Sequence, residues 1–177
     1  MVQQLSFNSN KRFDRFTLEQ IAGDLLPDAS QETRVGSGFN RLLLTTEEGG
    51  AQAKDYESRM LTDRVRAVGT AWLGQTTGCA QCHDHKYDPI TSKDFYAMGA
   101  FFADIKETAI GRREEGMPVL DAQQAAQMEI LEKKLKALQA GKPSKEEIAS
   151  IEKAIKAIQA ASPKTLVSVS LDKKRVV

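Results

Sequence analysis

The strongest constraint on the fold lies in the last third of the chain, where apolar residues recur at steps of three and four. Two stripes share this spacing: Met128, Leu131, Leu135 and Leu138, then Ile148, Ile151, Ile155 and Ile158. Gly141-Lys142-Pro143 separates them, and Ser144 with Glu147 is typical of the capping box at a helix start. Each stripe covers only about two heptads, so each helix needs a packing partner. The pattern predicts an antiparallel helical hairpin, a coiled-coil-like connector, over residues 118–163.

The preceding residues, 1–117, are predicted to form an irregular, mostly α-helical body. Three apolar faces at helical spacing indicate three helices: Leu18, Ile21, Ala22 and Leu25 before Pro27; Tyr56, Met60, Leu61, Val65, Val68 and Trp72 before Gly74; and Phe95, Met98, Phe101 and Phe102 after a cap at Thr91 or Ser92. Between the first two helices, glycines surround the short apolar run Leu42-Leu43-Leu44. We therefore expect residues 27–50 to be irregular and to hold one buried turn.

The composition changes beyond Pro118, where aromatic residues disappear and Ala, Glu, Lys and Gln dominate. This change marks a domain boundary. Close to the end, Thr165–Leu171 alternates apolar and polar residues, which indicates a strand, although no pairing partner is evident in the sequence. We expect three parts: the body over 1–117, the hairpin over 118–163 and a short strand-like tail over 164–177.

Charge and hydropathy exclude two classes of partner. The chain has 25 Lys and Arg residues against 24 Asp and Glu, and no basic run exceeds three residues, so nothing resembles a nucleic-acid-binding surface. No stretch approaches the roughly 18 consecutive apolar residues of a membrane span. Met1–Asn10 also lacks the features of a secretion signal. We therefore expect either a cytoplasmic protein or an excised piece of a longer one.

The only cysteines, Cys79 and Cys82, stand three positions apart, and His83 follows directly. Cys-x-x-Cys-His is the attachment pattern of c-type haem, because two thiols at this spacing reach the two vinyl groups on one porphyrin edge. The next residue then places its imidazole under the iron. The segment predicts covalent haem attachment through both cysteines, with His83 as the proximal iron ligand.

The sixth iron ligand is less well defined. The chain's other histidine, His85, stands too close to His83 to reach the opposite face of the same ring. Met60 and Met98 fit the apolar faces of helices, which favours a core role for both. Met117 lies beside Pro118 in a break between helices, where a side chain can be presented to a metal. Met117 is therefore the distal candidate.

Three other interpretations of the cysteine segment remain open. Cys79 and Cys82 with one or both histidines could bind Zn²⁺, the only case that gives His85 a metal, but no second ligand pair exists. The cysteines could form a redox dithiol, or a disulfide in an interaction module whose hairpin docks a partner. The match could also be chance. A further alternative is an enzyme whose haem or metal has an open sixth position. The sequence shows no further paired acid, base or nucleophile that supports this alternative.

Longer motifs follow one another from about Asn8 to Glu107. They are Phe16–Pro27, Gly38–Arg41, Thr45–Gly50, Asp63–Val65, Trp72–Gly74 and Gly78–Lys86. In this order they resemble the planctomycete-type cytochrome c-like domain, a family of the domain of unknown function 1549 type. The resemblance implies a haem-binding or redox role for Cys79, Cys82 and His83. We expect electron transfer rather than catalysis, because the residues identify no substrate chemistry.

The resemblance also implies a cellular context. That family occurs in large exported bacterial proteins, between an upstream haem-type cytochrome domain and a downstream domain of unknown function. It implies a periplasmic or otherwise extracytoplasmic location, where bacteria attach c-type haem, and a redox partner that the residues do not identify. The chain then corresponds to the second half of the domain with its connector, and residues 164–177 to the start of a truncated following domain.

Overall fold

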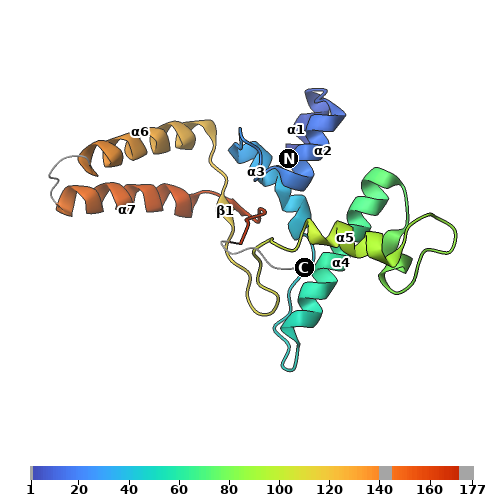
Figure 1. The fold of residues 1–177 in the computed structure, drawn as a ribbon. Coiled ribbons are helices and arrows are strands. Elements are labelled where there is room, and N and C mark those ends of the chain that lie inside the picture. The colour runs from blue at the N-terminus through green and yellow to red at the C-terminus, as the bar shows by residue number, and fades with distance from the viewer. Residues whose placement is uncertain (1, 140–144, 172–177) are drawn as a thin grey trace. The chain divides into compact units, whose positions relative to one another are not determined.

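The computed structural model describes residues 2–139 and 145–171, and this part of the chain is mostly helical (Figure 1). The elements are α1 (Val2–Asn8), α2 (Phe13–Ala22), α3 (Gln31–Gly36), the 3₁₀ helix η1 (Ser37–Arg41), α4 (Ala53–Val68), the π-helical turn η2 (Gly69–Leu73), the 3₁₀ helix η3 (Thr77–Gln81), α5 (Ser92–Ala100), β1 (Met117–Pro118), α6 (Ala122–Gln139), α7 (Lys145–Ala161) and β2 (Lys164–Thr165). The predicted mostly α fold is confirmed. One compact unit comprises residues 2–114 and 167–171, and another comprises residues 115–166.

Three short helices open the first unit, and only α2 was predicted. This helix ends at Ala22, earlier than the expected stop at Pro27. The seven residues of α1 and the six of α3 are too few to show an apolar period. Ser30 and Thr33 start α3 with a capping box in which a threonine hydroxyl takes the place of the usual Glu or Gln side chain. Local caps, rather than amphipathic patterning, therefore define this region.

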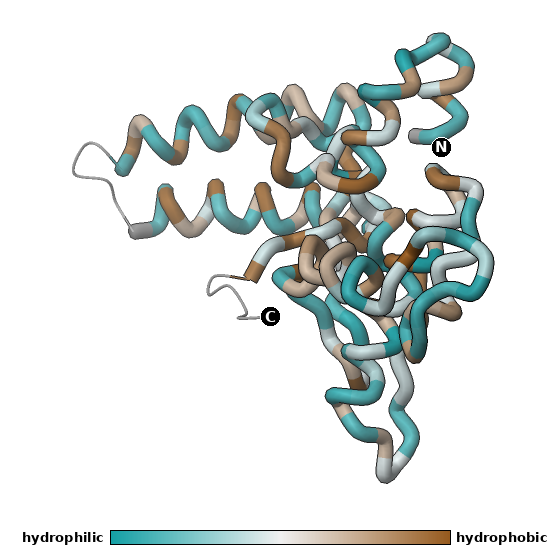
Figure 2. Tube along the Cα trace, turned by 45° about the vertical axis from the view of Figure 1, so that its right-hand side comes forward, coloured by the Kyte–Doolittle hydropathy of each residue, from teal (hydrophilic) through white to brown (hydrophobic). Residues whose placement is uncertain are grey.

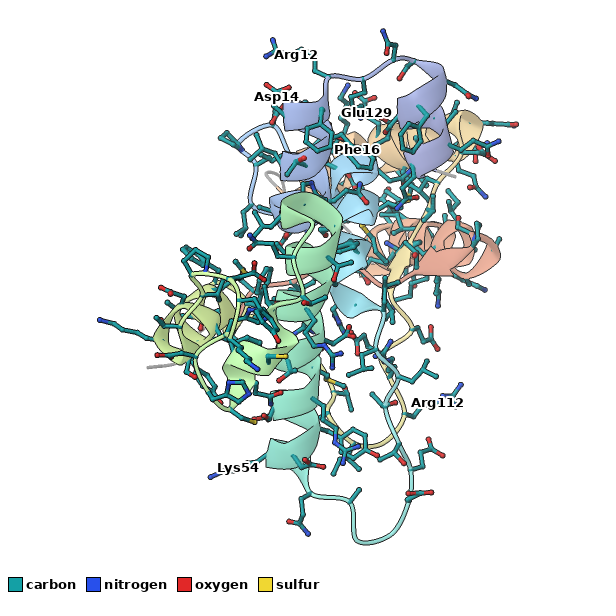
Figure 3. All side chains as sticks on the ribbon, turned by 90° about the vertical axis from the view of Figure 1, so that its right-hand side faces the viewer. Arg12, Asp14, Phe16, Lys54, Arg112 and Glu129 are labelled. Atoms are coloured by element: carbon teal, nitrogen blue, oxygen red, sulfur yellow. The ribbon has the colours of Figure 1, made fainter. Side chains whose placement is uncertain are left out.

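Close contacts hold these helices together. Phe7 of α1 and Phe16 of α2 stack with ring centroids 5.6 Å apart, while the exposed Arg12–Asp14 ion pair stands at the start of α2 (Figure 3). After α2, the chain approaches α3 so closely that a Cβ at Gly23 would lie 1.9 Å from the Thr33 carbonyl oxygen. Only glycine permits this approach.

The buried turn expected within residues 27–50 is present, but its buried residues are polar. Leu42 and Leu44 are 68% and 77% exposed, so the apolar run does not enter the core. Ser37, Asn40 and Arg41 of η1 are buried instead. Their partners come from the far end of the chain: Ser168 N donates to Ser37 Oγ at 3.1 Å, and Arg41 Nη1 donates to Val167 O at 3.0 Å.

Two further charged residues complete this cluster. Arg64 of α4 donates from Nε to Asn40 O at 2.6 Å and pairs through Nη2 with Glu107, and both charged side chains are less than 10% exposed. Arg41 Nε lies 3.7 Å from the same Glu107 carboxylate. We refer to Ser37, Asn40, Arg41, Arg64 and Glu107 as the polar junction. Because buried charges need partners, the junction fixes η1, α4 and the segment after α5 together.

The apolar core of the first unit is small and lies between α4, η3 and α5. Val65, Ala80 and Phe95 are its buried centre, and Ile90 and Met98 pack against it. The predicted cap of α5 is confirmed, because Thr91 accepts from Asp94 N in a capping box. Phe101 belongs to the apolar face predicted for this helix, but the expectation that it faces the core was wrong. It follows the last turn of α5 and is 87% exposed, whereas its neighbour Phe102 is 5% exposed.

The second unit contains the helical hairpin, with α6 and α7 running antiparallel side by side (Figure 1). Apolar residues recur along both helices in Figure 2, and every predicted stripe position is buried or half-buried amid mostly exposed neighbours. The spacing argument is therefore confirmed. The connecting Gly141-Lys142-Pro143 and the predicted cap at Ser144 lie outside the described residues.

The predicted strand near the end of the chain is much shorter than its alternating pattern. Only Lys164–Thr165 forms β2, which pairs antiparallel with β1 in the register Met117↔Thr165. Residues 167–171 instead belong to the first unit, where Ser170 forms an isolated antiparallel bridge with Ile105. No helix in the described ranges combines the length and apolar content that a membrane crossing requires.

We predict that Leu135→Asp or Ile151→Asp lowers helicity and melting temperature, because each places a charge in the half-buried seam of the hairpin. The expected loss is about 1–2 kcal/mol, measured by thermal unfolding followed by circular dichroism. Lys153→Asp, at an exposed position of α7, is the matched control and should have a smaller effect. Equal stability of wild type and both seam variants would contradict the paired-stripe packing.

We predict that Arg64→Met destabilises the first unit by about 3–5 kcal/mol, because it leaves the Glu107 carboxylate buried with a weaker cationic partner and removes a donor from Asn40 O. Urea unfolding gives the measurement. Arg59→Met is the control on the same helix. It breaks only an exposed pair with Asp55 and should cost about 0.5 kcal/mol or less. A cost as small for Arg64→Met would show that the junction does not carry stability.

Candidate cysteine-histidine site

The cysteine segment lies on η3 and the loop that follows it. Before it, Gly74 ends η2 in the left-handed region at φ 63°, which confirms the predicted helix stop. Thr77 and Ala80 anchor the turn, since they are 3% and 0% exposed and Thr77 Oγ1 donates to Val65 O at 3.3 Å. A Cβ at Gly69 would lie 2.5 Å from Thr77 Cγ2, so glycine allows η3 to pack closely on η2.

Neither cysteine is among the buried residues that anchor the turn. Cys79 and Cys82 are exposed and carry free thiols. The Cys79 carbonyl accepts from the backbone N–H groups of Cys82 and His83 at 3.3 and 3.4 Å, which holds the three residues in one turn. The arrangement presents two exposed cysteines on a turn that the buried residues Thr77 and Ala80 fix in place.

His83 is exposed, and its ring is oriented by a single hydrogen bond. Its Nδ1 lies 2.8 Å from the backbone oxygen of Asp84. A carbonyl oxygen only accepts, so this contact assigns the proton to Nδ1 and leaves the Nε2 lone pair available. Metal-binding histidines are typically oriented by such a bond from their other nitrogen. His83 therefore has the tautomer that a ligand through Nε2 requires.

His85 has the opposite arrangement. Its side chain is 7% exposed, and Nδ1 accepts from the backbone N–H groups of Asp88 at 2.9 Å and Tyr87 at 3.3 Å. In this neutral form the proton is on Nε2, so neither nitrogen is available to a metal. His85 N also donates to Ile90 O at 2.8 Å. The residue orders the loop between η3 and α5.

The described residues, 2–139 and 145–171, include no group of three or more His, Cys, Asp or Glu side chains placed to hold a metal ion. The described residues therefore contain no preformed site for Zn²⁺ with four protein ligands. The His85 ring instead accepts hydrogen bonds from backbone N–H groups. A haem site does not need such a cluster, because the protein supplies two thiols and one imidazole.

Two hollows flank the turn, and the sequence did not identify either. A hollow of about 260 Å³ is lined by Arg66, Thr70 and Cys79, with Arg66 so close that a Cβ at Gly78 would lie 2.9 Å from its Nε. The other, of about 230 Å³, is mainly apolar and is lined by side chains that include Phe95 and Met98. No motif in the sequence identifies Arg66 as part of this hollow. The only indication is its position on α4, two residues after Arg64, where it faces solvent.

The three methionines considered as distal ligands have different surroundings. Met60 is 1% exposed, which confirms its core role. Met98 packs against the core and also lines the apolar hollow. Met117 is half-buried in β1, in the second unit. Its assignment as distal ligand stays a prediction.

The motif order of the sequence is matched by a family model over residues 4–107, described as PSCyt2, protein of unknown function (DUF1549). The chain belongs to the PSCyt2 family. The matched PSCyt2 region runs from α1 to the Glu107 carboxylate of the polar junction and contains the cysteine segment. No curated protein and no solved structure matches the chain. The family resemblance is thereby confirmed at the level of a PSCyt2 domain of unknown function.

We predict that His85→Ala destabilises the PSCyt2 region by about 1–3 kcal/mol, because it removes a buried ring and the acceptor of the part-buried Asp88 N–H group. Chemical unfolding in the absence of any added cofactor gives the measurement. His83→Ala is the matched control and should stay within about 0.5 kcal/mol of wild type, since its ring is exposed. Equal losses for the two variants would refute their different roles.

Proposed function

We propose that this chain is a c-type haem-binding electron-transfer module of a larger exported bacterial protein. The observation that carries the proposal is the turn itself. Cys79 and Cys82 present free, exposed thiols, and the next residue, His83, has its Nδ1 bonded to a carbonyl and its Nε2 available. These are the donor groups, in the order and protonation state, that covalent haem attachment uses.

Attachment needs little from the chain beyond these three residues. Each thiol adds across one vinyl double bond, so that sulfur bonds to one carbon and the thiol hydrogen passes to the other, with no oxidant consumed. His83 Nε2 would be the nitrogen that holds the iron. When bound, haem supplies a reversible one-electron couple, and the described residues contribute its binding and orientation.

Covalent attachment also suits the size of the site. The hollows on either side of η3 measure about 260 and 230 Å³, below the roughly 300–1,000 Å³ of typical enclosed ligand sites. Hollows of this volume are too small to hold a haem macrocycle by burial alone. Two thioether bonds remove the need for enclosure, which supports attachment as the role of the paired cysteines.

The remaining parts of the proposal concern partners and location. We infer an extracytoplasmic, periplasmic-type location, because bacteria attach c-type haem there. The upstream and downstream domains of the same polypeptide are the proposed neighbours, a redox protein of unidentified type is the electron partner, and Met117 is the proposed distal ligand. The closely balanced charge of the chain supports no nucleic-acid partner.

The second candidate function is an interaction module, in which a disulfide or a Zn²⁺ clip rigidifies the turn and the hairpin docks a partner. The two free thiols could form a disulfide if an oxidant removes two electrons and two protons. The commitment of His85 to backbone N–H groups removes the fourth Zn²⁺ ligand, which favours haem over zinc.

We predict that the chain, fused to an export signal and expressed with haem-attachment machinery, retains a Soret band after denaturation. Its intact mass should increase by one haem. Cys79→Ala with Cys82→Ala should abolish both signals, because no sulfur remains to form a thioether. A colourless product of bare polypeptide mass, or one containing zinc, would overturn the proposal.

The two histidines give matched variants for the iron ligand. His83→Ala should keep the covalent mass while changing the Soret spectrum and the redox potential, since only the nitrogen ligand is lost. His85→Ala should leave the spectrum unchanged. Met117→Ala tests the distal ligand, and an unchanged spectrum and potential would remove it from the proposal.

A further inference from the structure

The hydrogen bond that orients His83 is itself held in place by the loop that connects η3 to α5 (Figure 1). The partner of His83 Nδ1, at 2.8 Å, is the backbone oxygen of Asp84. This oxygen belongs to the peptide unit that joins Asp84 to His85. The orientation of the His83 ring therefore depends on what fixes this one peptide unit.

A backbone bond to Ile90 fixes the N–H side of the peptide unit. His85 N donates to Ile90 O at 2.8 Å, and Ile90 packs against the buried apolar cluster of the first unit. The described residues include no cis peptide bond, and in a planar trans peptide the N–H and C=O groups point in opposite directions. The bond to Ile90 therefore directs the Asp84 carbonyl away from Ile90 and toward the His83 ring.

The Asp84 side chain anchors the same peptide unit to α5. Its Oδ1 accepts from the backbone N–H of Ser92 at 2.8 Å. Ser92 is the first residue of α5, so its N–H has no acceptor within the helix. The start of α5 is well defined in turn, because Thr91 and Asp94 form its capping box. Asp84 thus makes two connections, since its carboxylate reaches α5 and its carbonyl reaches the His83 ring.

We propose that Asp84 is a positioning residue for His83. Its carboxylate, bonded to the Ser92 N–H, keeps the Asp84 carbonyl in the orientation that binds the Nδ1 proton and leaves Nε2 of His83 free. A bond of this kind makes the opposite ring nitrogen a better donor to a metal. The inference rests on the proposed function for its purpose, which is to present Nε2 to the haem iron. The orientation itself is a property of the chain without haem.

The test measures the tautomers of the two histidine rings in the ¹⁵N-labelled full chain without haem. Long-range ¹H–¹⁵N spectra at about pH 9, where an imidazole ring is neutral, distinguish a protonated ring nitrogen from an unprotonated one. We expect opposite tautomers, with the proton on Nδ1 in His83 and on Nε2 in His85. The chain has only these two histidines, so the signals that disappear in His83→Ala assign both rings. A His83 ring protonated mainly on Nε2 would overturn the proposal.

Two substitutions at position 84 separate the hydrogen bond from the charge. Asp84→Ala removes the acceptor of the Ser92 N–H and should lower the ratio of the Nδ1–H to the Nε2–H tautomer in His83 about fivefold, as the loss of one hydrogen bond implies. Asp84→Asn loses the same charge but keeps a side-chain oxygen, so it should retain the wild-type ratio. An unchanged ratio in Asp84→Ala, or an equal loss in both variants, would contradict the positioning role.

A second pair of variants removes the donor instead of the acceptor. Ser92→Pro deletes the N–H that Asp84 accepts, at the first position of the helix, where proline is well tolerated. The preceding residue, Thr91, already has the extended backbone that proline favours in its predecessor. Ser92→Pro should lower the tautomer ratio as Asp84→Ala does, whereas Ser92→Ala keeps the N–H and should have no effect. Equal ratios in these two variants would show that the bond to α5 does not orient His83.

The His85 ring is an internal control for folding of the loop. Its bonds from the backbone N–H groups of Tyr87 and Asp88 do not involve Asp84, so its tautomer should stay the same in all four variants. A change of both rings in Asp84→Ala would mean a general loss of the loop and would refute a specific effect on His83. None of these spectra requires haem. A chain that attaches no haem would therefore refute the proposed function and leave the positioning of His83 by Asp84 intact.

Discussion

Two buried arginines, Arg41 and Arg64, share the carboxylate of Glu107, and the first compact unit is arranged around this contact. One arginine comes from η1 and the other from α4, while the glutamate follows α5. The unit has only a small apolar core. The buried ion pairs therefore hold together segments that hydrophobic packing would hold together in a larger domain. Because an unpaired buried charge costs far more than a misplaced methyl group, the geometry of these three segments is mutually fixed.

The same cluster extends to residues that lie far away in the sequence. Arg41 and Ser37 hold Val167 and Ser168 through buried hydrogen bonds, so residues near the end of the chain become part of the first unit. The junction therefore holds residues 167 and 168 against η1, while the separate apolar cluster of Val65, Ala80 and Phe95 supports the cysteine turn.

Much of the candidate haem site could be predicted from sequence because its chemistry is local. Cys79, Cys82 and His83 are neighbours, and their spacing defines what they can reach whatever surrounds them. The role of His85 in ordering the loop could not be predicted. The sequence shows two histidines two positions apart, and only the folded loop shows that one ring accepts backbone N–H groups while the other leaves a nitrogen available.

By itself the sequence determined the helices with a long apolar period, namely α4 and the two arms of the hairpin, together with the capping signal of α5 and the cysteine turn. Each of these depends on interactions between residues a few positions apart, which periodicity and spacing record. Only the tertiary structure decided that Leu42 and Leu44 face solvent while Arg41 is buried, and that Ser168 lies beside Ser37. Those outcomes depend on partners more than 60 positions away, and a side chain's intrinsic polarity does not reveal whether such a partner will compensate its burial.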